Sequence, residues 1–144
     1  RDLRMSRGLG DVYKRQIVTG KTGPLLGAAA SALLNALKRL AGIDQELDLV
    51  SAHAIEPIQT LKTQYLGSRN PRLHTDEILI ALSSSVTENA AAAAAMHQLP
   101  MLKGCDVHST VILSSVDADT LKKLGMNLTC DPVYEEEDRK YHKQ

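Results

Sequence analysis

The sequence predicts an α/β domain, a three-layer α/β/α sandwich around a small mixed sheet. Strand-like and helix-like apolar patterns follow one another along residues 17–134 in the order β-α-β-α-α-α-β-α-β, which implies helices on both faces of the sheet. The strongest strand pattern, residues 107–114, ends in a nearly continuous apolar run, as in a central strand that is covered on both faces. The 144 residues suffice for one domain.

The domain begins with a strand and a helix. Residues 17–19 are β-branched and predict a short strand that turns at Gly20. Apolar residues then recur at helical spacing, after a proline that suits a first helical position and before a glycine that suits a C-cap. This spacing predicts an amphipathic helix over residues 24–41, with Leu33 and Leu37 on its buried face.

A second strand and helix follow. Residues 47–50 alternate between apolar and polar side chains and predict a strand. Pro57 suits the first position of the next helix, whose apolar face would include Tyr65 and which would end at Gly67.

Two helices occupy the middle of the chain. Thr75 suits an N-cap, because acidic residues follow it in the first helical turn. A strand through residues 77–82 is the alternative, since short apolar runs are ambiguous. Asn89 ends this helix, and the alanines at 90–95 predict the next one.

The C-terminal part returns to the sheet. After the strand over residues 107–114, Asp117 is predicted to cap a short helix that ends at Gly125. Residues 126–130 predict a final strand, and residues 135–144 form a charged tail without a core pattern.

Residues 1–16 lack both a period-2 and a period-3.6 apolar pattern. They resemble the translated read-through of a sequencing adaptor and are set aside from the fold as a disordered segment; a genuine basic arm is the alternative. Without them, 12 basic and 15 acidic residues remain, so the domain is mildly acidic. An adaptor at the front would make residues 17–144 the C-terminal piece of a longer protein.

Composition excludes several classes of function. The formal charge is zero, and the aromatic residues are four tyrosines, which disfavours a nucleic-acid-binding protein. No apolar run approaches the ~20 residues that cross a bilayer, so no membrane association is expected. Cys105 and Cys130 form neither a disulfide framework nor a zinc motif and suit the reducing cytoplasm.

The Gly20-Lys21-Thr22 triplet invites comparison with a phosphate-binding P-loop. That motif needs a glycine five positions before Gly20, where this chain has Arg15. A weaker hypothesis remains: a strand followed by Gly-Lys-Thr-Gly and a helix N-terminus leaves amides, Lys21 and Thr22 for an anion. The alternative is a tight turn with a solvated lysine.

Metal and cofactor motifs are incomplete. His53 and Glu56 are one residue too far apart for the His-x-Glu of zinc deaminases, and no Pro-Cys-x-x-Cys follows. Cys105 and His108 supply two ligands, whereas zinc takes at least three from the protein. The sequence therefore predicts no metal and no cofactor.

Several polar residues suit general acid–base work. Arg72, His74 and Asp76 lie close together in the sequence, in the polar loop over residues 68–74 and in the first turn of the helix that follows it. His108 and Ser109 lie on the strongest predicted strand. The alternative is structural, with Asp76 serving the helix dipole and His74 solvated. His108 and Ser109 cannot pair as base and nucleophile, because adjacent strand residues point to opposite faces.

Residues 17–144 also resemble a known family, the bacterial domain of unknown function 1846, specifically its C-terminal part. The segments that carry the resemblance are IVTGKTG (17–23), EPIQTLKTQYLG (56–67), NPRLHTDEILIAL (70–82), LKGCDVHSTV (102–111) and LGMNLTCDPVY (124–134). The resemblance implies an α/β/α sandwich with a deaminase-like topology, without the zinc ligands of true deaminases. It also implies a longer protein, whose N-terminal region would be the first partner of this domain.

Two functional hypotheses follow. In the first, Lys21, Thr22, Arg72, His74, Asp76, His108 and Ser109 line a site for a phosphorylated or nucleotide-like small molecule, shared with the missing N-terminal region. In the second, the domain is a structural packing or homo-oligomerisation module, and the same residues hold its loops. Convergence of these side chains within ~10 Å, the scale of small ligand clefts, favours the first hypothesis, and dispersal over opposite faces favours the second.

Overall fold

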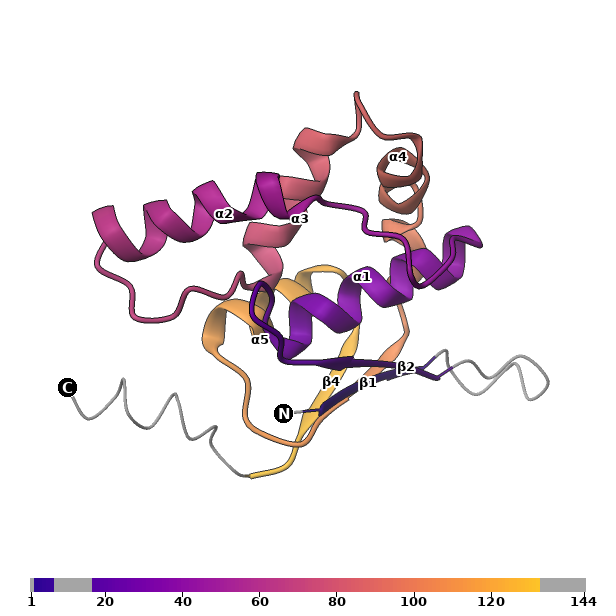
Figure 1. The fold of residues 1–144 in the computed structure, drawn as a ribbon. Coiled ribbons are helices and arrows are strands. Elements are labelled where there is room, and N and C mark those ends of the chain that lie inside the picture. The colour runs from indigo at the N-terminus through magenta and orange to yellow at the C-terminus, as the bar shows by residue number, and fades with distance from the viewer. Residues whose placement is uncertain (1, 7–16, 133–144) are drawn as a thin grey trace.

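A computed structural model describes residues 2–6 and 17–132 of the chain (Figure 1). Its elements in chain order are β1 (Asp2–Ser6), β2 (Ile17–Lys21), α1 (Ala28–Ala41), α2 (Ala52–Thr60), the π-helix η1 (Leu61–Tyr65), α3 (Thr75–Ser85), α4 (Ala90–Met96), the 3-10 helix η2 (Leu99–Leu102), β3 (Asp106–Ser109), α5 (Ser115–Lys123) and β4 (Asn127–Cys130). The predicted tail, residues 135–144, lies outside the described residues.

The sheet is mixed, as predicted. Its strand order is β2-β1-β3-β4, with β1 antiparallel to both of its neighbours and β3 parallel to β4. Together with the helices this confirms the α/β class. The deaminase-like topology stays a prediction.

The two faces of the sheet differ sharply in burial. Side chains that face α1 and the other helices are buried or half-buried; these are Leu3, Met5, Val18, Val107, Ser109, Leu128 and Cys130. Side chains on the other face are exposed; these are Arg4, Ile17, Thr19, Lys21, Asp106, His108, Asn127 and Thr129. Within the described residues, helices therefore cover one face only, and a third layer is not formed by them.

The helix α1 is the centre of the core. Leu33 and Leu37 are fully buried, which confirms the predicted inner face. The strand β2 lies so close to α1 that a Cβ added at Gly20 would stand 2.3 Å from the backbone nitrogen of Ala32. Gly20 is therefore part of the strand and permits close packing, rather than turning the chain.

The prediction of a disordered N-terminal segment is wrong for residues 2–6. They form β1, between β2 and β3, and Leu3 and Met5 are 0% and 2% exposed. The segment is too short for its two apolar side chains to establish a period, so main-chain pairing on both sides decides its structure. Residues 7–16 lie outside the described residues, and their adaptor origin stays a prediction.

The first helix begins four residues later than predicted. Residues 23–26 form a turn, in which the N–H of Gly23 donates to the carbonyl of Leu26. Leu73 pairs with this segment, donating to the carbonyl of Leu25 and accepting from the N–H of Gly27. This pairing with a distant loop holds the chain extended until Gly27.

The predicted strand over residues 47–50 is wrong. These residues form a loop, although Leu49 and Val50 are 1% and 6% exposed. Ser51 then caps α2, its hydroxyl accepting from the N–H of Ala54. The apolar alternation therefore reflects burial in a loop, not sheet pairing.

The helix α2 starts before Pro57, which lies inside it instead of at its first position. It continues into the π-helix η1, and Gly67 follows with a left-handed φ of 75°, as predicted for its end. Tyr65 was expected on the apolar face but is 76% exposed.

The remaining elements agree largely with the sequence. Residues 77–82 are helical, α4 begins at Ala90 as expected, with Asn89 as its N-cap, and β4 is present. The strand β3 ends at Ser109 rather than at residue 114, since the Ser109 hydroxyl accepts from the N–H of Val111 and turns the chain. Its outer face is exposed, so the expectation of a doubly covered strand is wrong for the described residues.

Candidate functional site

Three helices begin around one cleft. The N-termini of α1, α3 and α5 surround it, and the cavity has a volume of about 40 Å³. This exceeds the ~10–15 Å³ that one water needs, and is far below the size of a ligand pocket. The cleft is lined by Thr22, Gly27, Ala28, Ala29, Asn70, Arg72, Leu73, His74, Leu113, Ser114 and Asp117. Helix N-termini carry partial positive charge, which favours an anion, and the Asp117 carboxylate supplies a negative charge in the same cleft.

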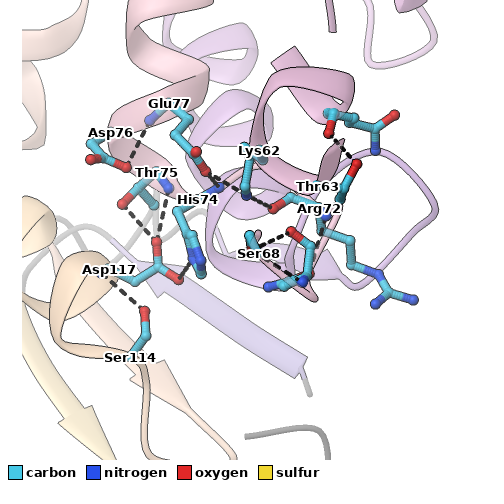
Figure 2. A network of polar contacts seen from close by, with 12 residues as sticks. Lys62, Thr63, Ser68, Arg72, His74, Thr75, Asp76, Glu77, Ser114 and Asp117 are labelled. Carbon is cyan, nitrogen blue, oxygen red and sulfur yellow. Dashed lines mark hydrogen bonds and ion pairs between the residues drawn. The ribbon is translucent and has the colours of Figure 1, made fainter. Parts of the chain in front are cut away.

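The Asp117 carboxylate is the principal buried charge of the cleft. It belongs to α5 but binds the start of α3, where its Oδ1 accepts from the Thr75 N–H and the Thr75 hydroxyl, both at 2.8 Å. Its Oδ2 lies 3.3 Å from Nδ1 of His74 (Figure 2). Because an ionised carboxylate only accepts, Nδ1 of His74 carries a hydrogen, and Nε2 is the ring atom left to take up or release a proton.

Each member of this pair favours the charged form of the other. The hydrogen bond to Asp117 raises the pKa of His74 above its ordinary value, against the opposing effect of burial. Burial opposes ionisation of Asp117, but the hydrogen bonds from His74 and Thr75 outweigh it and lower the pKa of Asp117. Asp117 is therefore a fixed anion, and His74 gains a proton more readily than a free histidine.

A second ion pair fixes the loop beside the cleft. Nζ of Lys62, a buried lysine on η1, donates to the Arg72 carbonyl at 2.6 Å and to Oε1 of Glu77 at 2.9 Å. The same Glu77 oxygen accepts from the His74 N–H at 2.8 Å, as in a capping box. Nε of Arg72 donates to the Gly23 carbonyl at 2.7 Å and so ties the loop to the turn before α1.

The start of α1 differs from the other two helix starts. Glu77 and Asp117 place carboxylates at the starts of α3 and α5, whereas the N-cap of α1 is Gly27, and this helix has no side-chain cap and no acidic residue in its first turn. Ala28 and Ala29 line the cleft at this end. The first turn of α1 thus has no cap and no acid of its own, and the carboxylate that lines the cleft beside it is that of Asp117, which is bound to Thr75 and His74.

The His74–Asp117 pair predicts a pH dependence of stability. The contribution of Asp117 to the free energy of unfolding is fully present above its ordinary pKa of 3.8, and it is lost as the pH falls through the lowered pKa. The contribution from His74 is present below 6.5 and is lost as the pH rises through the raised value. We expect His74→Asn, which keeps a donor near Nδ1, to lower the Tm most between about pH 4 and 6.5. A Tm difference that stays constant from acid to alkaline pH would contradict a charged pair.

Three of the seven residues predicted for the site line the cleft: Thr22, Arg72 and His74. The Arg72 guanidinium points away from His74 and Asp117 in Figure 2, so Arg72 acts on the cleft through its bond to Gly23. Lys21, Asp76, His108 and Ser109 are not brought there.

The other four residues have separate places. Lys21 lies exposed on the open face of the sheet, and Asp76 accepts from the N–H of Glu77 on its own helix. His108 is also on the open face, with Nδ1 2.7 Å from the Thr129 hydroxyl. Ser109 is buried on the opposite face, as strand alternation predicts.

Sequence reasoning missed Asp117 and Lys62 as members of the site. Asp117 was assigned the cap of α5, but Ser114 is the N-cap, and its hydroxyl accepts from the Asp117 N–H at 3.3 Å. Similarly, His74 and not Thr75 is the N-cap of α3. The Ser-x-x-Asp spacing from 114 to 117 is a local capping signal, whereas the contact of Asp117 with α3 has no signal in the sequence.

In the part of the chain that the structure describes, no three His, Cys, Asp or Glu side chains come together as metal ligands would. No helix there is long and apolar enough to cross a membrane. Gly20-Lys21-Thr22 is the end of a strand followed by a turn, and Lys21 lies on the face of the sheet away from α1.

Residues 11–140 match the family model described as "Domain of unknown function DUF1846, C-terminal". Similar curated proteins are UPF0371 proteins. The one from Corynebacterium aurimucosum is 58% identical over 128 residues, which are 89% of this chain and 26% of the relative. The one from Corynebacterium efficiens is 60% identical over 83% of this chain and 24% of the relative. The one from Streptococcus thermophilus is 52% identical over 89% of this chain and 26% of the relative. The chain thus spans about a quarter of the length of these relatives.

Proposed function

Since the chain belongs to the DUF1846 family, as its C-terminal domain, we propose that this domain contributes an anion subsite to a larger small-molecule site. The subsite is the cleft at the starts of α1, α3 and α5, and its ligand is the phosphate or another anionic group of a phosphorylated or nucleotide-like molecule. The remainder of the ligand would contact the rest of the longer chain.

The observation that carries this proposal is that His74 and a helix start without a cap or an acid of its own line the same cleft. The first turn of α1 has no side-chain cap and no acid, and Ala28 and Ala29 line the cleft. On the facing wall, Asp117 raises the pKa of His74 and so favours its cationic form. Backbone amides and an imidazolium are suited to phosphate oxygens.

The residues of the cleft have distinct roles in this proposal. The amides at the start of α1 and the Thr22 hydroxyl donate to the anion, and protonated His74 adds positive charge. Asp117, Lys62 and Arg72 are positioning residues: Asp117 orients the ring, Lys62 fixes the loop, and Arg72 holds the turn before α1. A cavity of about 40 Å³ suits one anionic group and not a whole nucleotide.

Binding of a bare anion is expected to be weak. An exposed helix start contributes ~0.3–1 kcal/mol, and a partly screened cation contributes a similar amount. A millimolar dissociation constant already corresponds to about 4 kcal/mol. We therefore expect millimolar affinity that falls with ionic strength.

Sulfate is the sharpest probe, because its charge does not change near neutral pH. We expect sulfate to shift the amide resonances of Thr22, Ala28 and Ala29 in a titration followed by NMR, and His74→Asn to weaken this binding severalfold. Affinity should also fall as the pH rises through the raised pKa of His74.

Lys21→Ala is the matched control. Lys21 lies one residue from Thr22 but on the open face of the sheet, so its removal should leave the sulfate shifts unchanged. Shifts confined to the open face, or equal affinity in the chain and the His74→Asn variant, would refute the subsite.

A packing or homo-oligomerisation module is the second candidate. It is supported by exposed apolar side chains at the end of the continuous helix formed by α2 and η1, where Leu61, Tyr65 and Leu66 are 50%, 76% and 71% exposed. Analytical ultracentrifugation of the chain and of Tyr65→Ser tests it. We also propose a cytoplasmic location, because the two cysteines, Cys105 and Cys130, form neither a disulfide framework nor a zinc motif in the sequence.

A further inference from the structure

The strand β1 has an unusual position for so short a terminal segment. It lies in the interior of the sheet and pairs with β2 over residues 2–6 and with β3 over residues 3–6. Leu3 and Met5 face α1 and are almost fully buried, while Arg4 is exposed on the other face. In the described part of the chain, β2 is an edge strand, and its sheet partner is β1 alone.

The strand β1 also lies outside the family match, which covers residues 11–140 and therefore includes β2, α1 and every later element. The sheet of the shared domain, taken without β1, consists of β2 on one side and β3 with β4 on the other. The slot between β2 and β3 would then expose the main-chain groups of both strands and the core beneath Leu3 and Met5.

The slot cannot close by direct pairing of β2 with β3. Adjacent strands lie ~4.8 Å apart, so strands separated by one position are about 10 Å apart. The strand β2 is held against α1, because Gly20 leaves no space between the two backbones. Sliding β2 toward β3 would require α1, whose inner face is the centre of the core, to move with it.

We propose that the slot between β2 and β3 is a strand-acceptor site, filled in the longer relatives by a strand from the sequence that precedes the matched domain. In this chain residues 2–6 occupy the site. The occupant is defined by its chemistry: an extended segment with two apolar residues at positions i and i+2 that face α1. Main-chain hydrogen bonds to both neighbours supply the rest of the binding, as in β-strand addition.

The length of the relatives supports this occupant. The matched residues are 26% of the Corynebacterium aurimucosum relative, and the family model describes the matched part as C-terminal. Sequence that can supply a strand is therefore present in the same polypeptide. The requirement for only two apolar side chains explains how Leu3 and Met5 satisfy the slot without a longer apolar pattern.

The full-length Corynebacterium aurimucosum relative provides the direct test, by hydrogen exchange and mass spectrometry. In the described part of this chain β2 pairs with β1 alone, so the amides of the segment that matches β2 report whether the slot is filled. We expect the segment that matches β2 to be protected for minutes to hours. Exchange of this segment as fast as that of surface loops would overturn the proposal.

Two substitutions in this chain test the register of the occupant. Leu3→Asn places a polar group under α1 and should lower the Tm by about 10 °C, whereas Arg4→Asn on the exposed face should leave it within about 2 °C. Equal effects of the two substitutions would overturn the proposal.

Deletion of residues 1–16 tests whether the slot can close. We expect β2 to lose its protection, and a synthetic peptide of residues 1–7 to restore it when added in excess. The same peptide with Asn at both apolar positions should not. If β2 stays protected after the deletion, or if neither peptide restores it, the acceptor site is refuted.

Discussion

Replacing Gly20 with alanine should destabilise the domain by about 3 kcal/mol or more, a fall in Tm of about 10 °C. A Cβ at this position would lie 2.3 Å from the Ala32 nitrogen, 2.5 Å from the Ala28 carbonyl oxygen and 2.5 Å from the Ala32 Cβ. Two of these atoms belong to the backbone of α1, so no side-chain rotation relieves the clash. The sheet and its principal helix would have to separate.

Gly23→Ala is the matched control for this prediction. It is the same chemical change three residues later, at a glycine with open space around its Cβ position and without a left-handed φ. We expect its Tm to stay within about 2 °C of the unchanged chain. Thermal unfolding followed by circular dichroism measures both variants. Similar Tm values for the two would mean that β2 does not pack on α1 as described.

Removal of the Asp117 carboxylate by Asp117→Ala should cost about 3 kcal/mol of unfolding free energy. Asp117 is 8% exposed, and its removal leaves the Thr75 N–H, the Thr75 hydroxyl and His74 without their acceptor. The contact between α3 and α5 would lose its polar connection. Urea unfolding at about pH 6, where Asp117 is ionised and His74 is largely protonated, measures the full effect.

Asp119→Ala provides the comparison, because it removes an exposed carboxylate from the same helix. Its effect should stay within about 0.5 kcal/mol. The Asp117→Ala variant should also lose most of the alkaline decline in stability that His74 causes, since Asp117 is the main cause of the raised pKa of His74. Equal urea midpoints for the two alanine variants would contradict the buried network.

The seven residues predicted from the sequence are divided between the arrangements that the two functional hypotheses predict. Thr22, Arg72 and His74 share one cleft, as the small-molecule hypothesis requires. Lys21 and His108 lie on the open face of the sheet, away from the cleft, as the packing-module hypothesis predicts. The subsite that we propose therefore depends less on the Gly-Lys-Thr motif than on the start of α1 and on the pair of His74 with Asp117.

Local features of the sequence determined the class of the fold and most of the helices. The inner face of α1 at Leu33 and Leu37, the cap at Asn89 and the glycines after the helices depend on residues a few positions apart. Periodicity and capping chemistry are local, so they can be recognised in a single sequence.

Contacts between distant segments decided the rest. Because Leu73 pairs with residues 25–27, α1 begins later than its apolar spacing predicts. Residues 47–50 pair with no described strand and form a loop, although part of this segment is buried. The Asp117 carboxylate accepts a hydrogen bond from Thr75 at the start of α3, 42 residues earlier in the chain, and no spacing within α5 reveals this contact. Residues 2–6 became a central strand because two neighbouring strands offered main-chain partners and α1 offered an apolar surface. The sequence alone determined which segments could form elements, and only the tertiary structure decided their pairing, because hydrogen-bond partners and burial are supplied by residues far away in the chain.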